Sequence, residues 1–338
     1  MKVYIIGFGR MGYAHYLVVR KILPNAEIKV FDTQTIPRAY AQEIVINDIK
    51  ELEGYIRNSK PDLVIISTTS TARFSYLKMC FFTNIKYILC EKPVCVSLLE
   101  AEFLETAMKK FPEVNVAVNH QMRFMEQYTR IKKMISDEGF GPLGSIAVQA
   151  GNFGAAMNGT HYFEMFRFLT DQYATKIWAW LKPQGGINPR GNMFQDMAGS
   201  IRLENKLRQR FYIDTSEDQG HGVFVTYTCK HGQIHVDELM GRVYASKRKN
   251  SEDMQLPTTR YGMTSECYDF KIEPADALEP TARVLKSLLE GQNFPSLVDG
   301  IMAVKTLVAA YASSEFSGKE IDVDDIPFEY KDKVFTWA

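Results

Sequence analysis

Short apolar runs alternate with longer amphipathic segments over the first 120 residues of the chain. Runs such as Val3–Ile6 are typical of strands buried on both faces, and apolar positions spaced by three and four residues predict helices between them. The pattern predicts strands over Val3–Ile6, Glu27–Phe31, Asp62–Ser67, Tyr87–Cys90 and Val114–Val118, and helices over Met11–Leu23, Asp48–Asn58, Ser70–Phe82 and Ser97–Phe111. Strands that alternate with helices form right-handed crossovers, so we expect a parallel, doubly wound α/β domain.

The pattern changes near residue 120, where strands begin to follow one another without helices between them. We expect helices over Met125–Ile135, Thr160–Leu169, Thr281–Glu290 and Ser296–Ser314, and strands over Ser145–Gly151, Lys176–Leu181, Ser200–Leu203, Gln209–Ile213, Gly222–Cys229 and Gln233–Val236. Consecutive strands indicate a mostly antiparallel sheet and an α+β domain. We therefore divide the chain into residues 1–120 and 121–338, packed tightly together, and interpret the basic run Lys247–Lys249 as a solvated loop.

Composition excludes several classes of partner. The 338 residues carry 40 basic and 40 acidic side chains, and this zero balance provides no overall attraction for nucleic acid or for anionic membranes. No run reaches the roughly 18 apolar residues that span a bilayer, and we expect neither a signal peptide nor a metal site. The five cysteines are odd in number and lack CxxC spacing, so we expect reduced thiols and a cytoplasmic protein.

A glycine-rich motif directly follows the first predicted strand. The residues Gly7, Phe8, Gly9, Arg10, Met11 and Gly12 have the GxGxxG spacing, with a helix after them. The glycines permit a tight turn, close approach of a pyrophosphate and close helix packing, and the helix start offers N–H groups to phosphate. Asp32 lies 20 residues beyond Gly12, as expected of a carboxylate that binds the adenosine ribose. A structural turn without ligand is the alternative.

Asp32 also bears on the choice of dinucleotide. Its carboxylate would repel a 2′-phosphate, and the next residues offer no arginine to bind one, because Arg38 is farther along the chain. The sequence therefore favours NAD over NADP.

A Glu-Lys-Pro turn, Glu91–Pro93, follows the predicted strand Tyr87–Cys90. The carboxyl ends of parallel strands are where open α/β sheets bind ligands. Lys92 could hold a substrate hydroxyl or polarise a carbonyl at that edge. The alternative is an exposed lysine in a solvated loop.

Taken together, these motifs resemble the Gfo/Idh/MocA oxidoreductase family. The resemblance spans nearly the whole chain and rests on the glycine motif with His15, the segment Ile66–Ser70, the Glu-Lys-Pro turn, Asn119 with Arg123, the segment Gly159–Arg167, the turn at His231–Gln233 and the segment Leu288–Gly291. It implies a Rossmann domain followed by a domain with a large, open-faced sheet that serves for oligomerisation, as a dimer or tetramer. The implied activity is NAD(P)-linked oxidation of a secondary alcohol on a sugar, sugar derivative or cyclitol.

The resemblance also implies roles for individual residues. Lys92 would orient the reacting hydroxyl, His161 would accept its proton, and Thr68, Thr69, Glu91, Lys92 and Asn119 would join the cofactor site. On the substrate side we predict Arg123, Asn158, Arg190 and His221, with further lining candidates in Asn152, Trp178, Lys182, Gln195 and Asp196.

The residues around His161 agree with this role. Gly159 and Thr160 precede a helical apolar pattern, which places His161 in the first turn, where the helix dipole favours a neutral imidazole. The alternative is a histidine that caps or packs the helix start. We expect structural or peripheral roles for His15, His221, His231 and His235.

Two positions depart from the family pattern. Met157 stands where many members have an aspartate four residues before the histidine, and Arg73 stands where many have a histidine. These changes keep two alternatives open: a dinucleotide-binding sensor without catalysis, as in a yeast co-repressor of galactose genes, and an enzyme that keeps NAD bound, such as a sugar–sugar oxidoreductase or NAD-assisted glycosidase.

Overall fold

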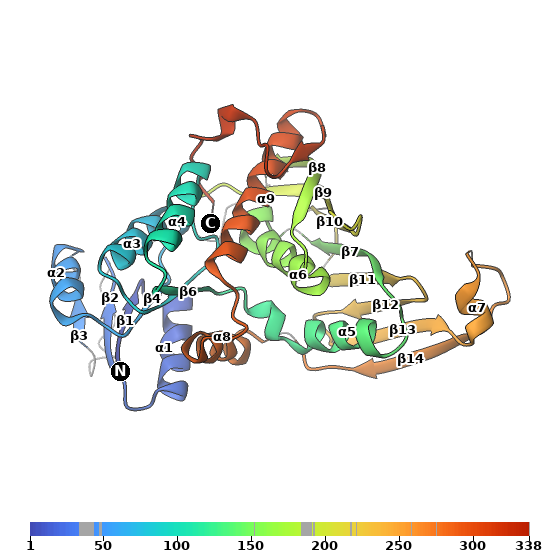
Figure 1. Cartoon of the computed structure of the whole chain (residues 1–338), viewed down its shortest axis with the longest axis horizontal. Coiled ribbons are helices and arrows are strands. Elements are labelled where there is room, and N and C mark those ends of the chain that lie inside the picture. Colours follow the sequence, from blue (N-terminus) through green and yellow to red (C-terminus); the bar gives the residue numbers. More distant parts are fainter. Residues whose placement is uncertain are drawn as a thin grey trace.

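Two β-sheets stand side by side with a layer of helices between them (Figure 1). The structure, a computed structural model, describes residues 1–33, 44–46, 49–151, 153–183, 191, 193–216, 218–220, 222–257, 259–274 and 276–337. The predicted residues Arg190 and His221, and the candidate Asn152, lie outside the described residues.

The first sheet is parallel and has the strand order β3-β2-β1-β4-β5-β6. Its strands are β1 (Lys2–Ile6), β2 (Glu27–Phe31), β3 (Ile44–Ile46), β4 (Leu63–Ile66), β5 (Tyr87–Cys90) and β6 (Asn115–Val118), and the intervening helices are α1 (Arg10–Ile22), α2 (Ile49–Ser59), α3 (Ser70–Phe82) and α4 (Leu98–Lys110). The predicted doubly wound domain is confirmed. The prediction missed only the three-residue strand β3, which is too short to show a period.

Alternate side chains of the buried strands pack on opposite faces of this sheet. Val3 and Ile5 of β1 pack on the side of α1, whereas Tyr4 and Ile6 face the side of α2, α3 and α4. Helix α8 (Leu278–Glu290), far along the chain, completes the first of these layers. The segment after residue 120 therefore contributes to the core of the nucleotide-binding half.

The second sheet has nine strands in the order β14-β13-β12-β11-β7-β10-β9-β8-β15, and only β7 with β10 is a parallel pair. The strands are β7 (Leu143–Gly151), β8 (Ala174–Pro183), β9 (Met197–Asn205), β10 (Arg210–Ser216), β11 (Val223–Cys229), β12 (Gly232–Asp237), β13 (Arg242–Arg248), β14 (Ser265–Lys271) and β15 (Ile321–Asp322). The helical segments are η2 (Gln121–Phe124), α5 (Glu126–Asp137), the π-helical turn η3 (Ala155–Gly159), α6 (Thr160–Thr170), α7 (Ser251–Gln255), α9 (Leu297–Glu315) and η4 (Phe328–Tyr330). The predicted mostly antiparallel second sheet is confirmed.

The interpretation of Lys247–Lys249 as a solvated loop is wrong, because Lys247 and Arg248 end strand β13. Val243 and Ala245 of that strand are fully buried, and the Lys247 ammonium group donates to the carbonyl oxygen of Glu138 at 2.6 Å. The sequence did not predict this strand, because basic residues at both of its ends leave only a short alternating segment between them.

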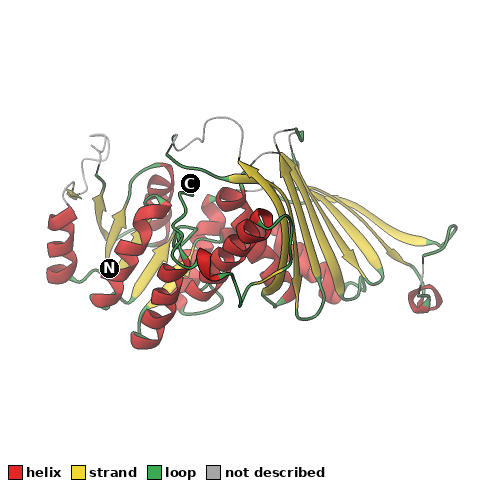
Figure 2. Cartoon of the chain, turned by 90° about the horizontal axis from the view of Figure 1, so that it is seen from above, coloured by secondary structure: helices red, strands yellow, loops and turns green. Residues whose placement is uncertain are grey.

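Only one face of the second sheet is covered by helices in the described part of the chain, apart from α7 beyond its far end (Figure 2). Helices α5, α6 and α9 occupy the covered face, between the two sheets. Among the described residues, α9 is long and apolar enough to cross a membrane, but 72% of it is buried inside the protein. It is a core helix that packs against α4, α6 and β8.

Candidate active site

The glycine-rich loop lies at the point where the strand order of the first sheet reverses, between β1 and β4. Gly7 has a φ of +87°, and a Cβ added to it would lie 2.7 Å from the Thr68 nitrogen in the loop after β4. A Cβ on Gly12 would lie 2.0 Å from the Gly7 carbonyl oxygen. Both positions therefore require glycine, and the loop exposes backbone N–H groups at the start of α1, as a pyrophosphate site needs.

Asp32 stands at the end of β2 and faces this loop. Its Oδ2 accepts the backbone N–H of Phe8 at 2.6 Å, which fixes the carboxylate beside the first turn of the motif. This arrangement fits a dinucleotide whose adenosine ribose meets Asp32 and whose phosphates meet the N-terminus of α1. The side chain of Thr69 is exposed and that of Thr68 half-buried across the crevice.

Glu91 organises the Glu-Lys-Pro turn from within. Its Oε1 lies 2.8 Å from Nε2 of His15 and accepts the side-chain amide of Asn119 at 2.8 Å. Burial opposes ionisation, but the hydrogen bond and charge of His15, with the charges of Arg73 and Lys92, lower the pKa of Glu91 to about 2. Glu91 and Asn119 therefore shape the predicted cofactor site through their bond to each other. His15 is structural, as expected, but it is fully buried and not peripheral.

Arg73, the other departure from the family pattern, holds the same turn from the opposite side. It is 1% exposed, and its guanidinium donates to the carbonyl oxygen of Pro93 at 2.7 Å. The sequence does not predict this contact, because Arg73 and Pro93 are 20 residues apart. They meet because α3 follows β4 and Pro93 follows β5, and these two strands are neighbours in the sheet.

Lys92 and His161 come together from different halves of the chain. The Lys92 ammonium group donates to the carbonyl oxygen of Met157, in the π-helical turn η3 that leads directly into α6. His161 is the second residue of α6, and both side chains are 7% exposed. Burial and the charges of Lys92 and His120 hold the pKa of His161 well below its usual range. The imidazole is therefore neutral at physiological pH and can accept a proton.

His120 is a neighbour that sequence reasoning left unassigned. Its ring meets that of His161 edge-on, with centroids 5.5 Å apart. Burial and the charges of Lys92 and Arg123 lower its pKa to about 3, so it too is neutral. The Nδ1 atoms of both histidines are buried without a hydrogen-bond partner among the described residues.

The two predicted substrate residues that the structure describes are engaged with the protein. Arg123 is buried in an ion cluster, where it pairs with Glu164 and with Asp299 at 3.2 Å. The side-chain amide of Asn158 donates to the carbonyl oxygen of Phe153 at 2.9 Å. Trp178 does not line a pocket beside His161. Its neighbour Ile177 is buried on the covered face of the second sheet, so the Trp178 side chain lies on the opposite, uncovered face.

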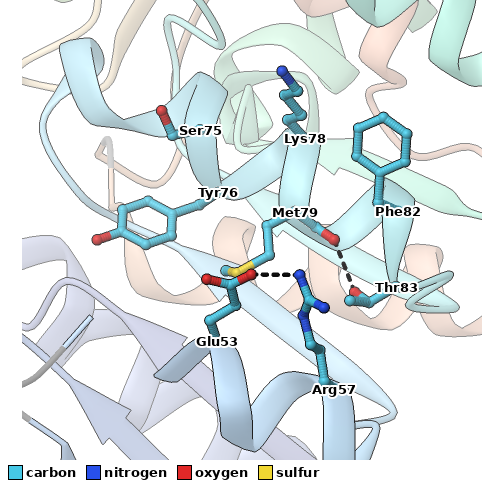
Figure 3. A pocket seen from close by; sticks show the side chains of 8 residues that line it. All are labelled: Glu53, Arg57, Ser75, Tyr76, Lys78, Met79, Phe82 and Thr83. Carbon is cyan, nitrogen blue, oxygen red and sulfur yellow. Dashed lines mark hydrogen bonds and ion pairs between the residues drawn. The ribbon is translucent and has the colours of Figure 1, made fainter. Parts of the chain in front are cut away.

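A separate groove of about 470 Å³ lies between α2 and α3 on the outside of the first sheet (Figure 3). It is lined by Glu53, Arg57, Ser75, Tyr76, Lys78, Met79, Phe82 and Thr83, and Glu53 pairs with Arg57 one turn away on α2 at 2.6 Å. None of these residues belongs to the cluster around Lys92 and His161.

Comparison with known proteins gives an independent result for residues 1–120. A family model described as an oxidoreductase family with an NAD-binding Rossmann fold, Gfo/Idh/MocA, matches residues 1–120. An inositol 2-dehydrogenase from Arthrobacter sp. (strain FB24) is 25% identical over 190 residues, which are 52% of this chain and 56% of that protein. The chain thus matches little more than half the length of this curated relative.

Solved structures extend the similarity of fold to nearly the whole chain. The transcriptional regulator Gal80p from Kluyveromyces lactis has a TM-score of 0.76 at 14% identity, covering 96% of this chain and 94% of that one. An oxidoreductase from Agrobacterium radiobacter, in complex with NAD+, L-tartaric acid and magnesium, has a TM-score of 0.76 at 15% identity, covering 96% and 98%. GenD2 from gentamicin A biosynthesis, in complex with NAD, has a TM-score of 0.72 at 17% identity, covering 95% and 96%.

Proposed function

We propose that this chain, whose first 120 residues match the NAD-binding Gfo/Idh/MocA oxidoreductase family, is a dehydrogenase of secondary alcohols. The substrate is a sugar, a sugar derivative or a cyclitol, oxidised at one CH–OH group or reduced at the matching ketone. The substrate class draws support from the similarity to an inositol 2-dehydrogenase. The preference for NAD over NADP follows from Asp32 beside the glycine-rich loop.

One observation carries the proposal: the contact between Lys92 and the turn that begins the helix of His161. An ammonium group can orient a hydroxyl, and a neutral imidazole can accept its proton. Lys92 follows β5 at the carboxyl edge of the parallel sheet, the edge that also carries the dinucleotide loop.

The bound dinucleotide supplies the hydride acceptor at its nicotinamide ring. Lys92 then orients the substrate hydroxyl by a hydrogen bond from its ammonium group and favours the build-up of negative charge on that oxygen. His161 takes the hydroxyl proton on an imidazole nitrogen as the carbon loses hydride. The burial of both groups limits water around the reacting carbon, and in the reverse direction His161 returns the proton.

Formation of NADH with a panel of sugars and cyclitols tests the proposal directly. Lys92→Met and His161→Asn should each lower kcat by about 10²- to 10⁴-fold with a confirmed substrate, in the range of acid–base groups. Lys78→Met serves as the control, because Lys78 is exposed on α3, outside the cluster around Lys92 and His161. Full turnover by either site variant would contradict the roles assigned to Lys92 and His161.

The same measurements separate the two alternative functions. A dinucleotide-binding sensor, compatible with the fold similarity to Gal80p, would bind NAD without turnover on any substrate. An enzyme that keeps its cofactor would retain NAD through exhaustive dialysis and transfer hydride between two sugars without free NADH. The neutral His161 beside Lys92 favours catalysis over the sensor.

We also propose that the protein is a cytoplasmic homo-oligomer, a dimer or tetramer, whose subunits meet through the uncovered sheet face. This face carries the exposed aromatic residues Trp180, Tyr212, Phe224 and Tyr244. Arg202 lies over the rings of Trp178 and Tyr212, at 4.5 and 5.9 Å, which holds a flat aromatic surface in place. All five cysteines are free thiols and four are buried, which agrees with a reducing compartment.

A further inference from the structure

Asp196 places a buried carboxylate under the turn that contacts Lys92. The residue precedes β9 and is 3% exposed. Its Oδ1 accepts the backbone N–H groups of Ala156 at 2.9 Å and Met197 at 2.8 Å, and its Oδ2 accepts that of Met157 at 2.8 Å. Two consecutive amides of the π-helical turn thus converge on one side chain from a different part of the chain.

This support acts at the start of the turn. The N–H groups of Asn158 and Gly159 both reach the single carbonyl oxygen of Gly154, at 3.1 Å each. The N–H groups of Ala156 and Met157 come earlier in the turn, and both donate to the carboxylate of Asp196. With these amides fixed, the carbonyl oxygen of Met157 is held where the Lys92 ammonium group donates to it.

Asp196 also acts on Lys92 through space. Burial raises the pKa of Asp196, whereas its three N–H donors and the positive charge of Lys92 oppose that shift. Both groups bond to Met157, Asp196 at its N–H and Lys92 at its carbonyl oxygen, so the carboxylate lies near the lysine and favours its charged form.

Neighbouring contacts fix Asp196 in turn. The N–H of Gln195 donates to the carbonyl oxygen of Thr336 at 2.8 Å, and the next residue, Trp337, accepts the hydroxyl of Ser70 at the start of α3. Trp337 is 1% exposed and packs against Tyr311. The segment bearing Asp196 is thereby tied to the first domain next to the Thr68–Thr69 loop.

We propose that Asp196 is the positioning residue of Lys92, which it acts on by fixing the Met157 carbonyl and by placing a negative charge near the ammonium group. The proposal rests on the proposed function for the role of Lys92 in catalysis. Asp196 itself touches no reacting atom. A side chain that stabilised the fold without acting on Lys92 would leave the titration of Lys92 unchanged, and this separates the two roles.

The test compares Asp196→Asn with Tyr311→Phe. Asparagine keeps the shape but loses the charge and one acceptor, whereas Tyr311→Phe removes only the hydroxyl 3.5 Å from Oδ1 of Asp196. The pH dependence of acylation of Lys92 by acetic anhydride, followed by mass spectrometry of the Lys92 peptide, reports its titration without any substrate. We expect Asp196→Asn to shift that titration to lower pH and Tyr311→Phe to leave it in place.

The kinetic arm uses the same two variants. We expect Asp196→Asn to lower kcat by about 10- to 100-fold, the effect of a misplaced catalytic group, with the Kd for NAD unchanged. Wild-type values of both kcat and the Lys92 titration in Asp196→Asn would overturn the inference. Should that variant fail to fold, Asp196→Glu takes its place, with kcat lowered and the Lys92 titration kept. Full activity of Lys92→Met would instead overturn the proposed function and leave the Lys92 titration result standing.

Discussion

Nε2 of His15 lies 2.8 Å from Oε1 of Glu91, and both side chains are buried. His15 is on α1, one turn beyond the glycine-rich loop, and Glu91 begins the turn that carries Lys92. The pair therefore joins the helix predicted to bind the phosphates to the turn proposed to bind the substrate. Asn119, at the end of β6, completes the connection through its own bond to Glu91.

Glu91→Gln is expected to destabilise the protein and weaken catalysis together. A glutamine would keep one acceptor but remove the charge that meets His15, and loss of a charged buried hydrogen bond costs about 2 to 3 kcal/mol. Chemical unfolding would show the change in free energy, and kcat would fall as the Lys92 turn loosens.

Lys305→Gln is the control for this change. It removes the pairing with Glu105 at 2.6 Å, which is only partly buried and lies outside the site. Salt bridges near the surface contribute about 1 kcal/mol or less. A Glu91→Gln protein no less stable than Lys305→Gln would contradict the connecting role of Glu91.

The nucleotide half could be predicted almost element by element from the sequence. Helix Ser70–Phe82 and strands Glu27–Phe31 and Tyr87–Cys90 have the predicted bounds, because each is an apolar-rich segment that polar residues follow directly. The far end of the second sheet was missed for the opposite reason. Strand β13 has charged residues at both ends, and β14 contains Glu266, Asp269 and Lys271 and has no buried residue, so neither strand shows a long apolar face in the sequence.

The site divides in the same way. Local motifs identify Gly7, Asp32, Lys92 and His161, since spacing along the chain carries their signal. Their hydrogen-bond partners are distant in sequence, so spacing does not reveal them. Asp196 bonds to Met157, 39 residues away along the chain, and Arg73 bonds to Pro93 because the strands before them, β4 and β5, are paired. Arg123 illustrates the limit, because an arginine at the mouth of the site and one in an ion cluster look alike in sequence.

Replacing Asp32 should change the choice of cofactor. Asp32→Ser removes the carboxylate that would meet the ribose hydroxyls and the charge that would repel a 2′-phosphate. We expect the Kd for NAD to rise by about tenfold and the Kd for NADP to fall, measured by fluorescence titration of the reduced cofactors. Asp62→Ser is a matched control, because Asp62 binds the Lys2 amide at the opposite edge of the sheet. An unchanged NAD-to-NADP ratio in Asp32→Ser would contradict the role of Asp32.

A charge at the centre of the uncovered sheet face should separate the subunits. Phe224 of β11 is 53% exposed there, and Phe82 on α3 of the first domain is 56% exposed. Burying a carboxylate in an interface without a partner costs several kcal/mol, so Phe224→Glu should lower the oligomer's mass in sedimentation experiments. Phe82→Glu should not. A wild-type oligomer in Phe224→Glu would place the contact on another surface.

Glu238 gives the protein a stability that declines with rising pH. Its carboxylate accepts the hydroxyls of Tyr128 at 2.5 Å and Tyr162 at 2.7 Å in the layer between α5, α6 and the second sheet. Burial raises the pKa of Glu238 to about 7, although the two hydrogen bonds oppose the shift. Because the folded protein holds this proton more tightly than the unfolded chain, the contribution is full below about pH 4.5 and is lost as the pH rises through about 7.

Glu238→Gln isolates this effect from the histidines that titrate in the same range. The lowered pKa values of His120 and His161 act in the opposite direction, since their contribution is lost as the pH falls below about 6.5. They are present in both proteins, so the difference in unfolding free energy between wild type and variant reports Glu238 alone. We expect that difference to shift in favour of the variant by as much as about 3 kcal/mol between pH 5 and about pH 8. A difference that stays constant over this interval would mean that Glu238 is already ionised in the folded protein at pH 5, stabilised by its tyrosine donors.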